Sequence, residues 1–199
     1  MSGEHDEMRH IMHLLESGDG DRIDLLARAY AKYSKLDNVF VFVKTGGEIT
    51  EEMRQDGAKV YVLNGSKDTS FSTFEEISRI MLKYEIDTVV VQDELPLLHF
   101  YGRSLQMVKK DLRVIPFLHN NPENYETRGY LADKAMKMVV MQSFQNASKV
   151  IAATVEIQDT ATKVLGIKPD KISVLAHMSL DKPQEFAAEL DAVLRLEKI

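Results

Sequence analysis

The chain contains no cysteine among its 199 residues. This absence excludes disulfide bonds, thiolate metal ligands and cysteine nucleophiles. No apolar run approaches the roughly 20 residues that a membrane-spanning helix needs. The first ten residues, MSGEHDEMRH, lack the charged, apolar and small-residue order of a secretory signal. We therefore expect a cytoplasmic protein, with peripheral contact at the inner face of the membrane as the one membrane role left open.

An excess of positive charge is also absent, because 25 lysines and arginines face 31 acidic residues and the net charge is -6. Nucleic-acid binding depends on concentrated lysine and arginine, so we expect no nucleic-acid partner. Arg103, Lys109 and Lys110 share one predicted helix and favour contact with anionic lipid, although such charges more often form a solvated face. No HExxH or comparable spacing occurs, so we expect no metal site and no cofactor.

The sequence does contain a regular alternation of β-rich apolar runs and amphipathic helical stretches. This alternation predicts right-handed βαβ units and a parallel sheet covered on both faces. The fold class is therefore α/β: a single doubly wound, Rossmann-like domain with about seven parallel strands. The predicted strands are residues 9–15, 38–43, 59–64, 87–92, 113–119, 149–154 and 171–176. The predicted helices are residues 23–33, 48–55, 74–84, 96–110, 130–145, 156–165 and 184–199.

The domain organisation follows from the same pattern, because no linker or low-complexity segment interrupts it. We predict a flexible tail over residues 1–8, the Rossmann-like domain over 9–186 and a C-terminal amphipathic helix over 187–199. In the last stretch, apolar residues recur at i, i+4, i+7 and i+8, which gives this helix one apolar stripe to bury. These residues are Phe186, Leu190, Val193 and Leu194.

Ligands bind open parallel sheets beyond the carboxyl ends of the strands, so the loops at that edge hold the candidate residues. The first loop, SGDGD over residues 17–21, contains Gly18 and Gly20. Glycines allow a tight turn, and backbone N–H groups at a helix start can hold a phosphate. An ordinary turn in which Asp21 or Asp24 caps the helix is an equally weighted interpretation.

Two further loops carry polar residues at the same edge. His119 ends the fifth strand and is followed by Asn120 and Glu123; a histidine there suits hydrogen bonding to a substrate and, if it titrates near neutrality, acid or base work. The alternative is a histidine that satisfies neighbouring backbone groups. Asp93 and Glu94 follow the fourth strand as acceptor-binding candidates, or as an acidic first helical turn favoured by the helix dipole.

Four passages together resemble the N-terminal half of family 4 glycosyltransferases, which have the two-domain GT-B fold. They are GGEITEEMRQDGAKVYVLN, YEIDTVVVQDELP, RVIPFLHNNPE and KVIAATVEIQDTATKVLGIKPDKISVLAHMSLDKPQEF. The last resembles the family's strand, helix, glycine-x-x-proline-x-lysine-isoleucine turn and closing passage before the second domain. The resemblance covers about residues 9–186 and is distributed over the chain rather than concentrated in one motif.

The resemblance implies transfer of a sugar from a nucleotide-sugar donor to an acceptor, with retention of configuration, between two domains. It places Gly18 and Gly20 near the donor diphosphate and His119, as the catalytic residue, against the transferred sugar. Asp93, Glu94, Asn120 and Glu123 would then face the acceptor. Most of the nucleotide site belongs to the second domain, which is not among these residues, so the chain alone is expected to be inactive.

Two other functions remain open. The glycine pair is interrupted, and its G-x-G-x-x-I pattern approaches a dinucleotide fingerprint whose third glycine is missing. The second strand ends in Val43 and Lys44, so NADP rather than NAD would be the ligand of such an oxidoreductase. A non-catalytic partner subunit of a split glycosyltransferase is the third hypothesis.

Overall fold

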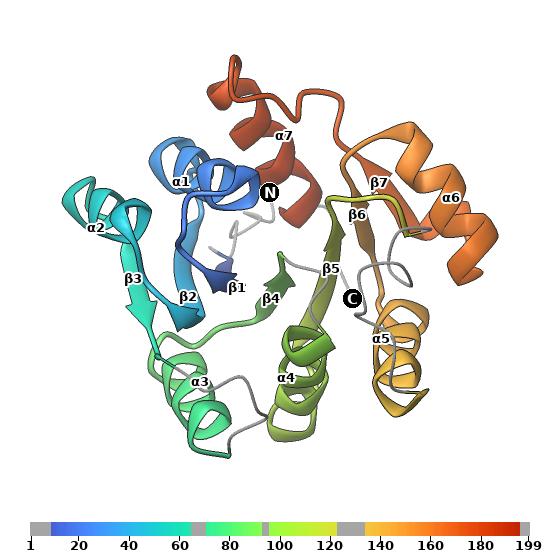
Figure 1. Cartoon of the computed structure of the whole chain (residues 1–199), viewed down its shortest axis with the longest axis horizontal. Coiled ribbons are helices and arrows are strands. Elements are labelled where there is room, and N and C mark those ends of the chain that lie inside the picture. The colour runs from blue at the N-terminus through green and yellow to red at the C-terminus, as the bar shows by residue number, and fades with distance from the viewer. Residues whose placement is uncertain (1–8, 65–70, 93–95, 123–133, 196–199) are drawn as a thin grey trace, which may run out of the picture.

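The computed structural model describes residues 9–64, 71–92, 96–122 and 134–195. Within these residues, seven strands form one sheet in the order β3-β2-β1-β4-β5-β6-β7, and every neighbouring pair is parallel (Figure 1). The predicted α/β, Rossmann-like fold class is confirmed. The chain starts at the centre of the sheet, moves to one edge and returns past β1 to the other.

The elements follow one another in strict alternation along the described chain. The strands are β1 (His10–Ser17), β2 (Asp37–Thr45), β3 (Lys59–Val62), β4 (Thr88–Val91), β5 (Arg113–Leu118), β6 (Val150–Ala152) and β7 (Ile172–Val174). The helices are α1 (Arg22–Tyr33), α2 (Glu48–Gln55), α3 (Phe71–Lys83), α4 (Pro96–Val108), α5 (Lys134–Asn146), α6 (Val155–Leu165) and α7 (Pro183–Arg195), with a 3-10 turn, η2 (Pro169–Lys171).

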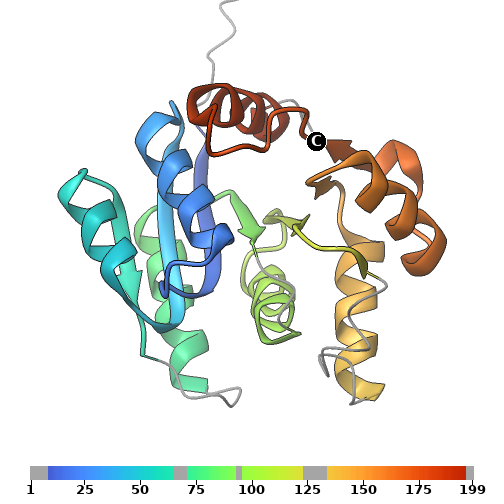
Figure 2. The ribbon, with the colours of Figure 1, turned by 45° about the horizontal axis from the view of Figure 1, so that its top comes forward.

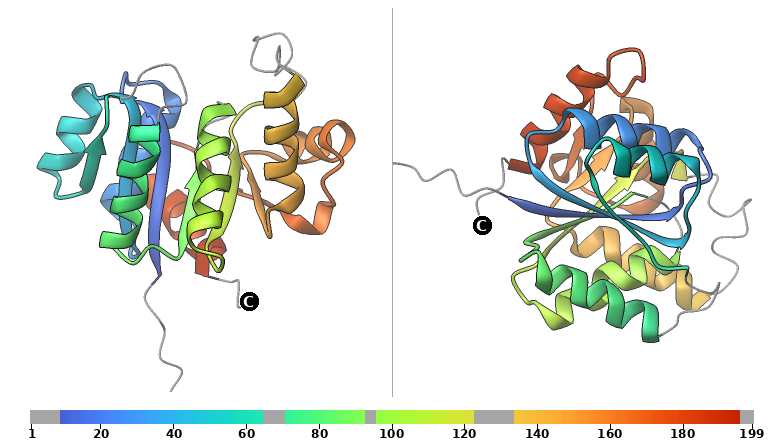
Figure 3. Two further views of the ribbon diagram at one scale, coloured as in Figure 1. Left: turned by 90° about the horizontal axis from the view of Figure 1, so that it is seen from below. Right: turned by 90° about the vertical axis from the view of Figure 1, so that its left-hand side faces the viewer.

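Helices cover both faces of the sheet, as Figure 3 shows edge-on. Helices α1, α2 and α7 lie on one face, and α3, α4 and α5 lie on the other. Side chains of β1 alternate between the two cores: Ile11 and Leu15 pack under α1, whereas Met12 and Leu14 pack under α3 and α4. Because β4 and β5 are covered on both sides, they are buried along their whole length, and each is a continuous apolar run after its first residue, Thr88 or Arg113.

Several element boundaries differ from the predicted ones for local reasons. Strand β3 ends at Val62, and Asn64 adopts a positive φ of 50°, which a continuing strand cannot accommodate. Strand β6 ends at Ala152 because Thr154 caps α6 by accepting the Ile157 N–H at 3.2 Å. Helix α6 stops as predicted at Gly166, which has the left-handed φ of 65° typical of a helix C-terminus.

Helix α7 closes the domain by packing against α1, although the two helices lie at opposite ends of the chain (Figure 2). Its buried residues include Phe186, Leu190 and Leu194, three of the four predicted stripe positions. These side chains join the same core as α1 and α2. The helix begins at Pro183, so the predicted domain boundary at 186/187 falls inside α7.

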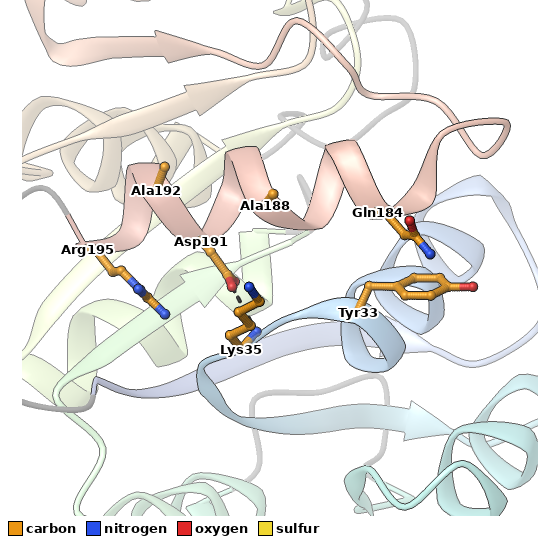
Figure 4. Close-up of a pocket in the computed structure, with 7 residues that line it drawn as sticks. All are labelled: Tyr33, Lys35, Gln184, Ala188, Asp191, Ala192 and Arg195. Atoms are coloured by element: carbon orange, nitrogen blue, oxygen red, sulfur yellow. Dashed lines mark hydrogen bonds between the residues drawn. The ribbon is translucent and has the colours of Figure 1, made fainter.

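A buried carboxylate at Asp191 fixes α7 to the end of α1. It accepts hydrogen bonds from the Tyr30 hydroxyl at 2.7 Å, the Ser34 hydroxyl at 2.6 Å and the Lys35 backbone N–H at 2.8 Å. Burial and the nearby Asp191 charge raise the pKa of Tyr30 well above its usual value, so its hydroxyl keeps its proton and donates. Figure 4 shows Asp191 and Lys35 beside a cavity of about 670 Å³, where α7 meets the segment between α1 and β2.

Candidate functional site

The sheet order brings three loops together at one edge. Strand order reverses between β1 and β4, and β5 is the next strand beyond β4. The loops that follow these strands are therefore neighbours at the carboxyl edge, where open α/β sheets bind ligands. The glycine loop of residues 17–21 and His119 lie at this edge, as predicted. Asn120 follows His119 and is half-buried, whereas Asp93, Glu94 and Glu123 lie outside the described residues.

The backbone N–H groups of both glycines in the loop have hydrogen-bond acceptors in neighbouring elements. Gly18 N–H donates to the Thr45 carbonyl at 2.9 Å, and Gly20 N–H donates to the Asp24 carboxylate at 2.9 Å. Asp21 caps α1 by accepting two of the first backbone N–H groups of the helix, at 2.8 and 2.9 Å. Burial raises the pKa of Asp24 to about 6. The backbone N–H groups of the two glycines, which were predicted to bind phosphate, are thus already hydrogen-bonded to β2 and α1.

The absence of a side chain at Gly18 has a packing reason. A Cβ atom at Gly18 would lie 2.5 Å from the Thr50 methyl group, and one at Gly47 would lie 2.1 Å from the Gly18 carbonyl oxygen. The loop after β1 therefore rests directly on the N-terminus of α2. Beside it lies a hollow of about 350 Å³, whose lining includes three acidic side chains. Its lining residues are Gly18, Asp19, Gly20, Arg28, Glu48, Ile49 and Glu52.

Replacing Gly47 with alanine should separate this loop from α2. The new methyl group meets backbone rather than a side chain that can rotate away, so we expect Gly47→Ala to lower the free energy of unfolding by about 1–3 kcal/mol in urea titrations. Gly102→Ala is the control, because its methyl group would meet only the side chains of Val91 and Val114, at 3.1 and 3.2 Å. A loss in Gly102→Ala as large as in Gly47→Ala would contradict the proposed backbone contact.

His119 lies beneath the edge with only 7% of its surface exposed. Its ring stacks on Phe117 with centroids 4.0 Å apart, and its Nε2 lies 3.0 Å from Gln92 Oε1. Burial, assisted by the nearby Arg22 charge, lowers the pKa of His119 to about 3. The expectation of titration near neutrality is therefore wrong, because desolvation disfavours the charged ring. His119 is therefore neutral at pH 7.

Arg22, the exposed first residue of α1, was not among the predicted site residues. Its guanidinium lies close enough to His119 to affect the histidine pKa, and it donates to the Met178 carbonyl in the loop after β7 at 3.4 Å. Arginine binds phosphate oxygens through paired N–H groups. Arg22 thus supplies the positive charge that the aspartate-rich loop lacks. The sequence feature that could have revealed Arg22 is its position directly after the glycine loop SGDGD.

The buried polar neighbours of His119 were not among the predicted site residues either. Gln92 directly follows the three valines of β4, and its amide lies 2.9 Å from His13 Nδ1. His13 is fully buried, as expected of a packed residue, and it stacks on Phe40 with centroids 4.7 Å apart. Burial lowers the pKa of His13 to about 4. The sequence feature that could have revealed this cluster is a glutamine directly after a buried strand, because a buried amide requires hydrogen-bond partners.

Other features of the described residues bear on the alternative functions. Lys44 forms an ion pair with Glu16, so the group proposed to meet a 2′-phosphate is already engaged. No cluster of three or more metal-ligating side chains occurs among the described residues. None of the described helices is long and apolar enough to cross a membrane.

The family model of Glycosyltransferase Family 4 matches residues 18–177. This match extends over most of the chain, and the chain belongs to this family. No curated protein matches the chain by sequence.

Solved structures share the fold with this chain at low sequence identity. Anabaena HepE, crystallised with UDP and glucose, matches with a TM-score of 0.65 and 16% identity over 84% of this chain and 44% of HepE. The lipopolysaccharide outer core galactosyltransferase WaaB matches at 0.56 and 14% over 83% and 45%. UDP-N-acetylglucosamine 2-epimerase from Rickettsia bellii matches at 0.57 and 10% over 94% and 49%. The chain therefore spans less than half the length of these proteins.

Proposed function

We propose that this chain is the acceptor-side, N-terminal half of a glycosyltransferase that transfers a sugar from a nucleotide-sugar donor to an acceptor, with retention of configuration. A second Rossmann-like domain, not among these 199 residues, would face the carboxyl edge and hold most of the nucleotide. The reaction would need no cofactor beyond the donor. The chain alone would not turn over substrate, because orientation of the donor requires both domains.

The observation that carries the proposal is the convergence of Arg22 and His119 at the carboxyl edge of a family 4 domain. Arg22 offers charge to a diphosphate, and neutral His119 offers a hydrogen bond to the sugar. The glycine loop fixes the start of α1 and thereby places Arg22. In this arrangement Gly18 and Gly20 contribute mainly the shape of the loop, and Asn120 lies beside the sugar or acceptor.

An NMR titration of the ¹⁵N-labelled chain with UDP-glucose tests the proposal. We expect weak binding, with a dissociation constant in the range of about 1 mM or above, and amide shift changes concentrated at residues 17–22 and 119–121. Arg22→Met should remove most of the response to UDP, because the guanidinium supplies positive charge close to His119. No glucose transfer by the isolated chain should be detected in a coupled UDP-release assay.

The control variant is Arg79→Met, since Arg79 lies near the C-terminal end of α3, which leads to the amino end of β4, and is paired with Glu75 at 2.7 Å. It should leave the UDP response at the carboxyl edge unchanged. Shift changes centred elsewhere, or equal losses in the two arginine variants, would overturn the assignment. Saturable micromolar binding of NADPH would favour the oxidoreductase alternative, and glucose transfer by the isolated chain would refute the division between two domains.

A further inference from the structure

A continuous chain of hydrogen-bonded polar side chains crosses four adjacent strands, running from the amino end of β2 to the carboxyl edge at β5. Its members are Asn38 on β2, His13 on β1, Gln92 directly after β4 and His119 directly after β5. Asn38 Oδ1 lies 3.0 Å from His13 Nε2, His13 Nδ1 lies 2.9 Å from Gln92 Nε2, and Gln92 Oε1 lies 3.0 Å from His119 Nε2. The sheet order β2-β1-β4-β5 places these four residues next to one another across the sheet.

A backbone carbonyl fixes the direction of this chain at its first member. The Asn38 amide approaches the Leu36 carbonyl oxygen at 3.0 Å, and a carbonyl only accepts, so the Asn38 NH₂ group faces it. The NH₂ group also donates to the Ser34 hydroxyl at 2.8 Å. Asn38 Oδ1 consequently faces His13 and must accept a hydrogen bond from His13 Nε2–H.

The donor of each following hydrogen bond is fixed by the hydrogen bond before it in the chain. Both histidines are neutral at pH 7, since burial lowers their pKa values to about 4 for His13 and about 3 for His119. A neutral ring has one N–H and one lone pair, so His13 Nδ1 accepts from the Gln92 amide. Gln92 Oε1 then faces His119 and accepts from its Nε2–H. The single proton of His119 is thereby committed to Gln92.

The other ring nitrogen of His119 is left as an acceptor. Its Nδ1 is buried and has no hydrogen-bond partner among the described residues. A buried polar atom without a partner costs about 1–3 kcal/mol, so a ligand that supplies a donor there gains that interaction. The acceptor requires an O–H or N–H group, which the hydroxyls of a sugar supply and phosphate or carboxylate oxygens do not.

We infer that Gln92 is a positioning residue of this site, which, held by His13 and Asn38, keeps the proton of His119 on Nε2 and presents Nδ1 as a hydrogen-bond acceptor for a substrate hydroxyl. The identification of the ligand as a sugar rests on the proposed function. The assignment of the His119 proton to Nε2 does not depend on it. In this role His119 orients substrate and donates no proton to the leaving group.

The nitrogen shifts of the histidine side chains in the unmodified chain test the inference directly. Long-range ¹H–¹⁵N spectra distinguish a ring nitrogen that carries a proton from one that carries a lone pair. We expect His119 to have its proton on Nε2 and a lone pair on Nδ1 throughout pH 6–8. A proton on Nδ1, or a mixture of the two tautomers, would overturn the inference without any variant being required.

Gln92→Met tests the positioning role, because methionine keeps the length of the side chain and removes both amide contacts. We expect the Nδ1–H tautomer of His119 to appear in the spectra of this variant. Gln106→Met is the matched control: the Gln106 amide donates to the Leu112 carbonyl at 3.2 Å and has no contact with the histidines. Retention of the pure Nε2–H tautomer in folded Gln92→Met would show that Gln92 only fills space.

Addition of UDP-glucose separates this inference from the proposed function. If both hold, the His119 Nδ1 resonance shifts as it gains a donor, while Nε2 keeps its proton. An Nε2–H tautomer that does not respond to UDP-glucose or to glucose would support the role of Gln92 and overturn the proposed sugar contact. A response in which Nδ1 becomes protonated would overturn the acceptor role.

Discussion

Asp191→Ala is expected to lower the free energy of unfolding by about 3–5 kcal/mol, because it removes a buried charged acceptor that three donors share. The Tyr30 hydroxyl and the Lys35 N–H then lose their partner at the junction of α1 and α7. Hydrogen bonds to a charged group contribute about 1.5–3 kcal/mol each, and the buried donors left behind add to the loss. Urea denaturation followed by circular dichroism measures the effect.

Two variants show whether the three contacts act together. Tyr30→Phe removes only the phenol donor and should lower the free energy of unfolding by about 1–2 kcal/mol. Glu185→Ala on the same helix is the control: its partners Lys182 and His177 are both about half exposed, so its loss should change stability by less than about 1 kcal/mol. An Asp191→Ala effect no larger than that of Glu185→Ala would contradict the role of Asp191 in holding α7.

The order of strands and helices was predictable from sequence because each element has its own periodicity. After their first residues, strands β4 and β5 are apolar runs, and α7 repeats its apolar residues at helical spacing, so each element is recognisable without its neighbours. Boundaries were less predictable because capping contacts decide them. Thr154 ends β6 by turning its side chain to α6, which is a local choice that apolar periodicity does not encode.

The candidate site was predictable only in part, because its chemistry depends on burial and on contacts between distant strands. His119 was found from its position after a strand, yet its low pKa follows from its burial in the folded chain and from the nearby Arg22 charge. Gln92 and His13 are 79 residues apart, and only the sheet order makes them neighbours. Their partnership therefore emerges from topology rather than from a motif.

The stability of the chain should depend steeply on pH between 7 and 4, since two histidines are buried in their neutral form. The unfolded chain protonates histidine near pH 6.5, whereas the folded chain protonates His13 only near pH 4 and His119 near pH 3. The unfolded state then binds more protons, so stability is fully present above about pH 6.5 and falls as the pH falls. Asp24 acts in the opposite sense, because its folded pKa of about 6 exceeds its ordinary value of 3.8.

Summed by proton linkage, the two histidines lose about 6 kcal/mol between pH 7 and pH 4, and Asp24 returns somewhat more than about 2 kcal/mol. We expect a net loss of about 3–4 kcal/mol in urea titrations at the two pH values. His119→Phe keeps a flat ring on Phe117 but removes one titrating group, so its loss should be below about 1 kcal/mol. Asp24→Asn should enlarge the loss to about 6 kcal/mol. Equal pH dependence in all three proteins would show that these buried groups do not titrate as their burial requires, and it would remove the basis for a neutral His119.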